Sequence, residues 1–144
     1  MNIQHVLATK GAHVITIRPE QTIREALDLF IRHNIGALVV LDDAGQLIGI
    51  LSERDILRAA PMNEAIFSQP VRGVMSRDII TAVPQDDLIS VANTMTEMRI
   101  RHLPVVDQGR LVGIVSIGDV VKAQRDEYRG EVETLQNQLL ADEI

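Results

Sequence analysis

Hydrophobic residues in this chain follow one order twice. Each copy opens with a short aliphatic run, at residues 14–17 and 79–83, with a proline at its end, Pro19 or Pro84. Proline has no backbone N–H to donate to a β-ladder, so each run predicts a short strand that stops there. Two similar units therefore start in this chain, separated by about half of its length.

An amphipathic helix is predicted after each proline. In the first copy Ile23, Ala26, Leu27 and Phe30 lie at positions i, i+3, i+4 and i+7. The second copy has apolar residues at the same spacing from Leu88 onward. This spacing gathers the side chains on one helix face, which we expect to lie in the core.

Two aliphatic runs follow each predicted helix. In the first copy, residues 37–41 and 47–51 flank the sequence DDAG, and in the second copy residues 103–106 and 111–115 flank DQG. Asp and Gly favour turns, so each pair of runs predicts a β-hairpin. The runs are apolar almost throughout, which indicates sheets that are covered on both faces. A further helix is expected from Glu53 and from Ile117.

The two copies align over most of the chain. Residues 14–43 match 79–108, and residues 45–59 match 109–123, with GILSERD at 49–55 repeated as GIVSIGD at 113–119. A repeat of this length indicates a duplicated β-α-β-β-α unit. We divide the chain into an N-terminal segment packed on the module (1–13), repeat 1 (14–60), a linker (61–78), repeat 2 (79–123) and a C-terminal helix (124–144).

The C-terminal segment has a narrow apolar stripe. Tyr128, Val132, Leu135 and Leu139 recur at spacings of 4, 3 and 4, which suits contact with another helix. Two heptads are too few to predict a coiled coil, so the segment either packs on its own module or pairs in a dimer. Gly130 weakens this helix by roughly 1 kcal/mol relative to Ala.

Composition narrows the classes of function. The 144-residue chain fits one compact domain, and its lack of Cys excludes disulfides and thiolate catalysis and suits a cytoplasmic, reducing compartment. We expect no membrane partner, because the chain has neither a signal-like start nor an apolar run of 18 residues. We expect no nucleic acid partner either, given a net charge of −6 and three aromatic residues.

The repeated Ser and Asp have two interpretations. Ser52 and Ser116 stand before predicted helices, with Asp55 and Asp119 three residues later, as in a capping box. Asp is short for the reach back that the box requires, which weighs against this interpretation. Alternatively, the carboxylates accept hydrogen bonds from a ribose diol, the serines bind phosphate or ribose oxygens, and Gly49 and Gly113 leave room for close approach.

Enzymatic motifs are missing. The sequence contains no G-x-G-x-x-G, P-loop, G-x-S-x-G or H-E-x-x-H, and its four histidines lack metal-ligand spacing. We therefore expect a binding module without catalytic residues, metal or catalytic cofactor. Arg101 and His102, directly before a predicted buried strand, form a basic group suited to phosphate in an otherwise acidic chain.

The duplicated unit and its G-x-x-S-x-x-D ending resemble the cystathionine-β-synthase (CBS) domain family, in particular small bacterial stand-alone CBS pairs. The resemblance covers residues 10–123 and implies an α/β (α+β) fold with two CBS repeats about a pseudo-twofold axis. It also implies a regulatory sensor that binds AMP, ADP, ATP or NAD(H) and acts in trans on an unknown protein effector. Family members commonly pair face to face, so a homodimer is expected.

The resemblance implies two ligand sites. The first would combine Lys10, Gly11, Ile15, Ile35, Gly36, Ala37, Arg101, His102, Ile114, Ser116 and Asp119. The second would combine Ile50, Ser52, Arg54, Asp55, Arg77, Ile80 and Ile100. Because the first copy has Gly36 and Ala37 where the second has Arg101 and His102, we expect the Asp119 site to bind phosphate more tightly. The alternative is a structural module in which Ser and Asp are only helix caps.

Overall fold

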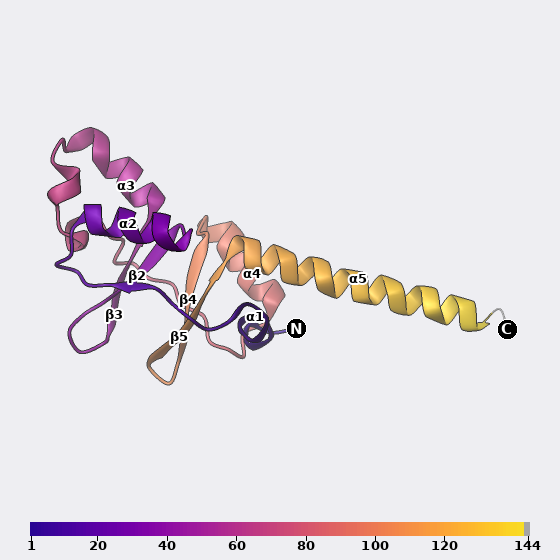
Figure 1. The fold of residues 1–144 in the computed structure, drawn as a ribbon. Coiled ribbons are helices and arrows are strands. Elements are labelled where there is room, and N and C mark those ends of the chain that lie inside the picture. The colour runs from indigo at the N-terminus through magenta and orange to yellow at the C-terminus, as the bar shows by residue number, and fades with distance from the viewer. Residues whose placement is uncertain (143–144) are drawn as a thin grey trace.

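A computed structural model describes residues 1–142 and contains both predicted repeats (Figure 1). Repeat 1 comprises β1 (Thr16–Ile17), α2 (Ile23–His33), β2 (Ala37–Leu41), β3 (Leu47–Ser52) and α3 (Glu53–Ala59). Repeat 2 comprises α4 (Leu88–Met98), β4 (His102–Asp107), β5 (Arg110–Ser116) and α5 (Ile117–Asp142). A helix α1 (Ile3–Lys10) precedes them. The predicted fold class is confirmed.

Each repeat has its own small sheet and core. In repeat 1, β1 pairs parallel with β2 and β2 pairs antiparallel with β3, while β4 and β5 form the hairpin of repeat 2. The apolar faces of α2 and α4 are buried as their spacing predicts, with Ile23, Ala26 and Phe30 in one core and Leu88 and Met95 in the other. Burial of these faces fixes how each helix lies on its sheet.

The opening strand of repeat 2, predicted over residues 79–83, is much shorter in the structure, so the predicted extent is wrong. Only Ala82 bridges to β4, where its N–H donates to Pro104 O and its carbonyl accepts from Val106 N–H. The next parallel hydrogen bond would need a donor at residue 104, and a proline there has none. The strand is therefore reduced to a single bridge.

The segment between the repeats, predicted as a linker, consists of short 3-10 turns held against repeat 1. These turns are η1 (Ala60–Met62), η2 (Ile66–Ser68) and η3 (Val71–Gly73). Ile66 and Val71 are buried in the core of repeat 1, which anchors the crossing to that repeat. Beyond them, Ser76 exchanges backbone hydrogen bonds with Ile50 of β3.

The N-terminal helix α1 packs on repeat 2, not on the repeat that follows it in sequence. Its N-cap Asn2 forms a capping box with His5, and Ile3, Val6 and Leu7 enter the core of repeat 2. Backbone bonds from Ile3 N–H to Asp86 O and from Leu88 N–H to Met1 O fix its start. The chain thus begins in one repeat and crosses to the other.

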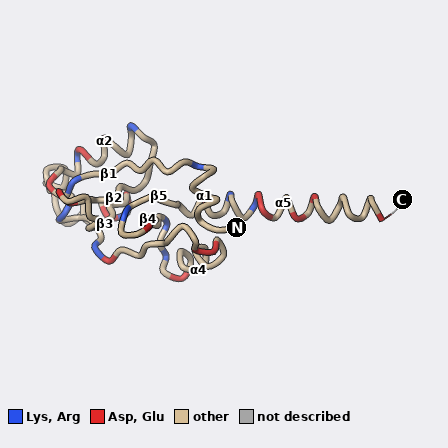
Figure 2. The backbone as a smooth tube through the Cα atoms, turned by 90° about the horizontal axis from the view of Figure 1, so that it is seen from below, with Lys and Arg blue, Asp and Glu red and all other residues tan. Residues whose placement is uncertain are grey.

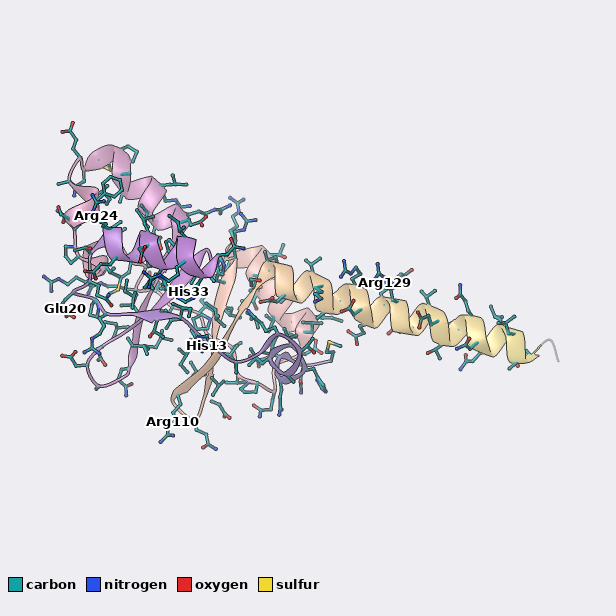
Figure 3. The ribbon with its side chains drawn as sticks, in the orientation of Figure 1. His13, Glu20, Arg24, His33, Arg110 and Arg129 are labelled. Carbon is teal, nitrogen blue, oxygen red and sulfur yellow. The ribbon has the colours of Figure 1, made fainter. Side chains whose placement is uncertain are left out.

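The helix predicted near Ile117 and the C-terminal helix predicted over 124–144 are one continuous helix, α5, of 26 residues. Residues 143–144 lie outside the described part of the chain. The start of α5 packs on α4 and α1, and the rest projects away from the two repeats as a single rod (Figure 1). Side chains such as that of Arg129 surround this rod without touching the repeats (Figure 3).

A candidate ligand site between the two repeats

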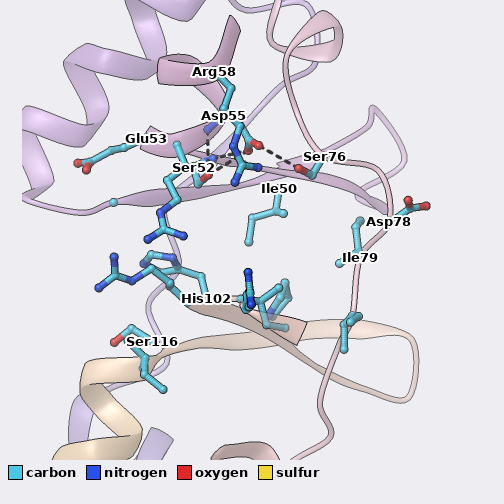
Figure 4. A pocket seen from close by; sticks show the side chains of 18 of the residues that line it. Ile50, Ser52, Glu53, Asp55, Arg58, Ser76, Asp78, Ile79, His102 and Ser116 are labelled. Atoms are coloured by element: carbon cyan, nitrogen blue, oxygen red, sulfur yellow. Dashed lines mark hydrogen bonds between the residues drawn. The ribbon is translucent and has the colours of Figure 1, made fainter. Parts of the chain in front are cut away.

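A cavity of about 630 Å³ separates the two repeats. Ile50, Ser52 and Asp55 line it from repeat 1, and His102 and Ser116 face them from repeat 2 (Figure 4). Its volume lies within the usual range for small-molecule sites. The ends of β3 and β5 place the two copies of the Ser-x-x-Asp motif near this space, because each strand leads directly into its helix.

Ser52 and Asp55 form a capping box at the start of α3. Ser52 N–H donates to Asp55 Oδ2 at 2.9 Å, and Asp55 N–H donates to Ser52 Oγ at 3.3 Å. The expectation that aspartate is too short for this reach is wrong, because both hydrogen bonds of the box are formed. The hydroxyl of Ser76 donates to the other oxygen, Oδ1, at 3.0 Å. Oδ2 also accepts from the Ser52 hydroxyl at 3.1 Å, so Oδ1 is the oxygen that keeps a lone pair for a ligand.

Asp119 repeats the box in α5 but has a different neighbour. Ser116 N–H donates to Asp119 Oδ2 at 2.8 Å, and Lys10 Nζ, arriving from α1, donates to the same oxygen at 2.6 Å. Lys10 also donates to Ile114 O at 2.8 Å. Burial acts to raise the pKa of Asp119, but the hydrogen bonds from Lys10 and Ser116 and the lysine charge outweigh it and lower that pKa. The carboxylate is ionised and already paired.

Four arginines line the cavity, and none forms an ion pair with any residue in 1–142: Arg54, Arg58, Arg99 and Arg101. Three acidic side chains, Glu53, Asp55 and Asp78, share the lining, so the formal balance is 4 − 3 = +1 with His102 neutral. A chain of net charge −6 thus concentrates cations at this place. Such a lining attracts anions.

His102 lies against Gly36 across the boundary between the repeats. A Cβ on Gly36 would lie 3.6 Å from His102 Cε1, an ordinary contact distance, so the backbone of one repeat lies close to the imidazole of the other. Burial, and then the charges of Lys10 and Arg101, lower the pKa of His102, whereas Asp119 and Glu53 oppose that shift. The ring is neutral at pH 7.

The two motif glycines give space to the protein's own side chains. A Cβ on Gly113 would lie 2.6 Å from Leu7 Cδ2, and a Cβ on Gly49 would collide with Met75. The expected room for ligand approach at these glycines is therefore filled, by α1 in repeat 2 and by the crossing segment in repeat 1. At both positions the lack of a side chain allows other parts of the protein to pack closely.

The cavity joins members of both predicted sites. From the first it includes Gly36, Arg101, His102 and Ser116, and from the second it includes Ile50, Ser52, Arg54, Asp55, Ile80 and Ile100. The remaining predicted residues are not in its lining: Lys10, Gly11, Ile15, Ile35, Ala37, Ile114, Asp119 and Arg77. Arg77 instead donates to Arg72 O at 3.4 Å.

Sequence reasoning missed several lining residues, chief among them Arg58, Ser76 and Arg99. Arg58 lies four residues after Arg54, hence on the same helix face, and that spacing could have identified it. Ser76 reaches the site through its pairing with Ile50, which no local pattern predicts.

Comparisons with known proteins agree on a family. The family model "CBS domain" matches residues 6–61 and 71–126. The chain is 39% identical over 116 residues to the CBS domain-containing protein YhcV of Bacillus subtilis, covering 81% of this chain and 82% of that protein. Other relatives are longer: the chain spans 39% of an uncharacterised protein of Methanocaldococcus jannaschii that is 37% identical to it.

Solved structures show the same arrangement. The CBS-domain containing protein ATU1752 from Agrobacterium tumefaciens has a TM-score of 0.83 at 38% identity, over 85% of this chain and 92% of that one. The CBS domain pair of protein MJ0100, in complex with 5-methylthioadenosine and S-adenosyl-L-methionine, has a TM-score of 0.79 at 30% identity, over 88% and 98% of the two chains. The duplicated unit, its Ser-x-x-Asp strand ends and these matches together make this chain a member of the CBS domain family, in the form of a tandem pair.

Proposed function

We propose that this CBS pair binds an adenosine nucleotide in the cavity between its repeats and thereby regulates another protein. The observation on which the proposal rests is the lining of that cavity, where a carboxylate and isoleucines face unpaired arginines. Arg58 lies beside Asp55 at the repeat 1 side, His102 and Ser116 lie at the repeat 2 side, and Ile50 and Ile79 lie between and to the right of them (Figure 4). A ligand with an apolar base and an anionic tail matches a lining that contains both kinds of side chain.

Asp55 is the group proposed to bind the ribose. Oδ2 accepts from the amide and the hydroxyl of Ser52, whereas Oδ1 accepts from Ser76 and keeps a lone pair for one ribose hydroxyl. Rotation of the Ser52 hydroxyl toward the ligand would open the second position, on Oδ2, for the other hydroxyl of the diol. The adenine would lie among Ile50, Ile80 and Ile100. The geometry favours Asp55 over Asp119 as the ligand-binding acid, which reverses the order expected from the sequence, because Asp55 lines the cavity and Asp119, paired with Lys10, does not.

Phosphates are proposed to lie near Arg101, His102 and the first turn of α5. Ser116, Ile117 and Gly118 border the cavity. Ile117 N–H already donates to Arg101 O and Asp119 N–H to Ser116 Oγ, so Gly118 N–H is the amide of this first turn proposed to reach a phosphate. The ligands of the MJ0100 pair, 5-methylthioadenosine and S-adenosyl-L-methionine, contain adenosine but no phosphate. The arginines here favour AMP, ADP, ATP or NAD(H) over such ligands.

Regulation would follow from differential affinity. A nucleotide that contacts both repeats binds most tightly to the relative arrangement of the repeats that allows both contacts. Binding therefore increases the population of that arrangement. The proposal includes a protein effector and a homodimer as the regulated state. Neither catalysis nor a metal is part of it.

A thermal-shift panel tests the proposal. Adenosine, AMP, ADP, ATP, NAD⁺ and S-adenosyl-L-methionine are compared, with GTP as the control for non-specific anion binding. A ligand at 100 times its Kd should stabilise the fold by about 2.7 kcal/mol. We expect the shift from phosphorylated adenosine compounds only. If none of the adenosine compounds raises Tm, the proposed function is wrong.

The capping boxes specifically favour the second candidate, a structural module without nucleotide. Asp55→Asn separates the two. Its amide oxygen can still accept from Ser52 N–H, so the helix cap and Tm should change little, whereas one neutral oxygen cannot accept from a diol as well. We expect titration calorimetry to show at least a tenfold weaker nucleotide affinity for Asp55→Asn and little change for Asp119→Asn. No nucleotide binding by any of the three proteins would favour the structural candidate, whereas equal measurable affinities would show that Asp55 does not bind the ribose.

A further inference from the structure

Helix α5 has two separate stripes of contact residues. The first holds it to the module: Val120 is buried, Ile117 and Ala123 pack on the same core, and Glu127 lies 3.5 Å from the N-terminal amine of Met1. These positions follow helical spacing, and the contacts end at Glu127. From Tyr128 to Asp142, no described part of the chain covers α5.

The second stripe lies on this uncovered part. Tyr128, Leu135 and Leu139 are 68%, 60% and 65% exposed, and Val132 completes the spacing of 4, 3 and 4. An isolated helix of this length is marginal in water, and Gly130 weakens it further. The rod therefore gains stability when the stripe is covered.

We propose that the α5 stripe pairs antiparallel with the same stripe of a second copy of this chain. In heptad terms Val132 and Leu139 occupy a positions, and Tyr128 and Leu135 occupy d positions. In one antiparallel register, each of these four residues of one copy lies opposite another of the four in the second copy. Tyr128 then lies opposite Leu139 of the other copy, and Val132 lies opposite its Leu135.

Charge selects this orientation. The heptad continues with Arg125 at the preceding a position and Asp142 at the following d position. The antiparallel register places Arg125 of each copy opposite Asp142 of the other, so an ion pair closes both ends of the apolar stripe. A parallel pair would place Arg125 against Arg125 and Asp142 against Asp142, which is repulsive.

The neighbouring charges agree with this choice. Within residues 1–142 the one acidic contact of Arg125 is with Asp126 of its own helix, at 3.8 Å, which is long enough for Arg125 to turn toward a partner. Acidic residues lie along the first half of the rod and again at its tip (Figure 2). In the proposed register Glu131 lies near Gln138 and Arg129 near Gln136, so no like charges meet beside the stripe.

Disulfide trapping tests the orientation directly, because the natural chain contains no cysteine. Tyr128→Cys and Leu139→Cys are prepared as separate proteins and oxidised alone and as a mixture, with Asn137→Cys, on the opposite helix face, as the control. We expect a mixed disulfide dimer, identified by its mass, only when Tyr128→Cys and Leu139→Cys are combined. Efficient dimers of either variant alone would show parallel pairing and overturn the proposal, as would no cross-linking above the Asn137→Cys level.

A matched pair of leucine variants tests the surface without cysteine. Leu135 and Leu140 are 60% and 62% exposed, but only Leu135 belongs to the stripe. In sedimentation experiments Leu135→Glu should raise the dimer dissociation constant at least tenfold, while Leu140→Glu should change it less than twofold. Equal effects of the two variants, or a natural chain that stays monomeric at millimolar concentration, would contradict the proposal. The surface is remote from the cavity, so this result does not depend on nucleotide binding.

Discussion

At the scale of single residues, the imidazole of His102 is poised to respond to pH. Burial and the charges of Lys10 and Arg101 lower its pKa below 6.5 in the folded state. As pH falls below 6.5 the unfolded chain takes up this proton first, so this residue's contribution makes the fold less stable until pH reaches the lowered pKa. A phosphate beside the ring would reverse the shift, since an anion favours the imidazolium.

Nucleotide binding should therefore take up a proton. The affinity for NAD⁺, whose pyrophosphate does not titrate in this range, is expected to rise as pH falls from 8 to 6. Titration calorimetry in buffers of different ionisation enthalpy measures the proton uptake. His102→Gln should bind with an affinity that is flat over this range, and an unchanged slope in that variant would remove His102 from the phosphate site.

Arg99 combines an unfavourable backbone conformation with a place in the cavity. It closes α4 at φ 54°, in the left-handed region, where the equivalent position of repeat 1 has Asn34 at φ 51°. Asn adopts this conformation more readily than arginine. The position therefore sacrifices local stability and presents a guanidinium to the site.

The variant Arg99→Asn should move stability and binding in opposite directions. We expect the free energy of unfolding to rise by roughly 0.5–1 kcal/mol, and nucleotide affinity to fall roughly tenfold as one charged contact is lost. Chemical denaturation and calorimetry measure the two effects. Arg129→Asn, on the projecting rod, is the control for loss of charge alone and should leave affinity unchanged.

At the scale of elements, the two motif glycines differ in how firmly they are enclosed. A Cβ on Gly49 would meet Met75 and also lie 3.1 Å from the backbone oxygen of Ser76, which hydrogen bonds to Ile50 N–H and cannot withdraw. A Cβ on Gly113 would meet only Leu7, a side chain that can rotate. The crossing segment is thus locked to β3 more rigidly than α1 is to β5.

Alanine substitutions measure this difference. Gly49→Ala should lower the free energy of unfolding on the order of 1–3 kcal/mol, as overpacking does, and Gly113→Ala should cost less. Gly73→Ala, where a Cβ has no neighbour within 4 Å, is the control. A larger cost at Gly113 than at Gly49 would show that α1 is the more rigid of the two contacts.

The elements themselves could be predicted from sequence, because the period of the apolar residues is a local property. The faces of α2 and α4 and both hairpins follow from it. The opening strand of repeat 2 failed because Pro104, in another strand, removes the donor that it needs. The prediction that aspartate is too short for the capping box failed for a different reason. The capping geometry at Ser52 depends on how the backbone passes from β3 into α3.

At the scale of the whole molecule, the sequence predicted that the two repeats differ, from Gly36 and Ala37 against Arg101 and His102, but it could not predict which partners the two motif acids would have. The repeats share their motif residues, yet Lys10 returns from the N-terminus to pair with Asp119, 109 residues later. In repeat 1 the equivalent acid meets only the hydroxyl of Ser76 beyond its own cap. Duplication predicts equivalent surroundings for the two acids, and the tertiary path of α1 makes them different.

One consequence follows from where α5 begins. Its first turn borders the cavity, and its 26 residues make a rigid rod about 39 Å long. A tilt of about 5° at that first turn would move the far end by about 3 Å, from the rod length given by the helix rise. A small adjustment around a bound phosphate would thus be magnified into a displacement as large as a side chain at the distant tip.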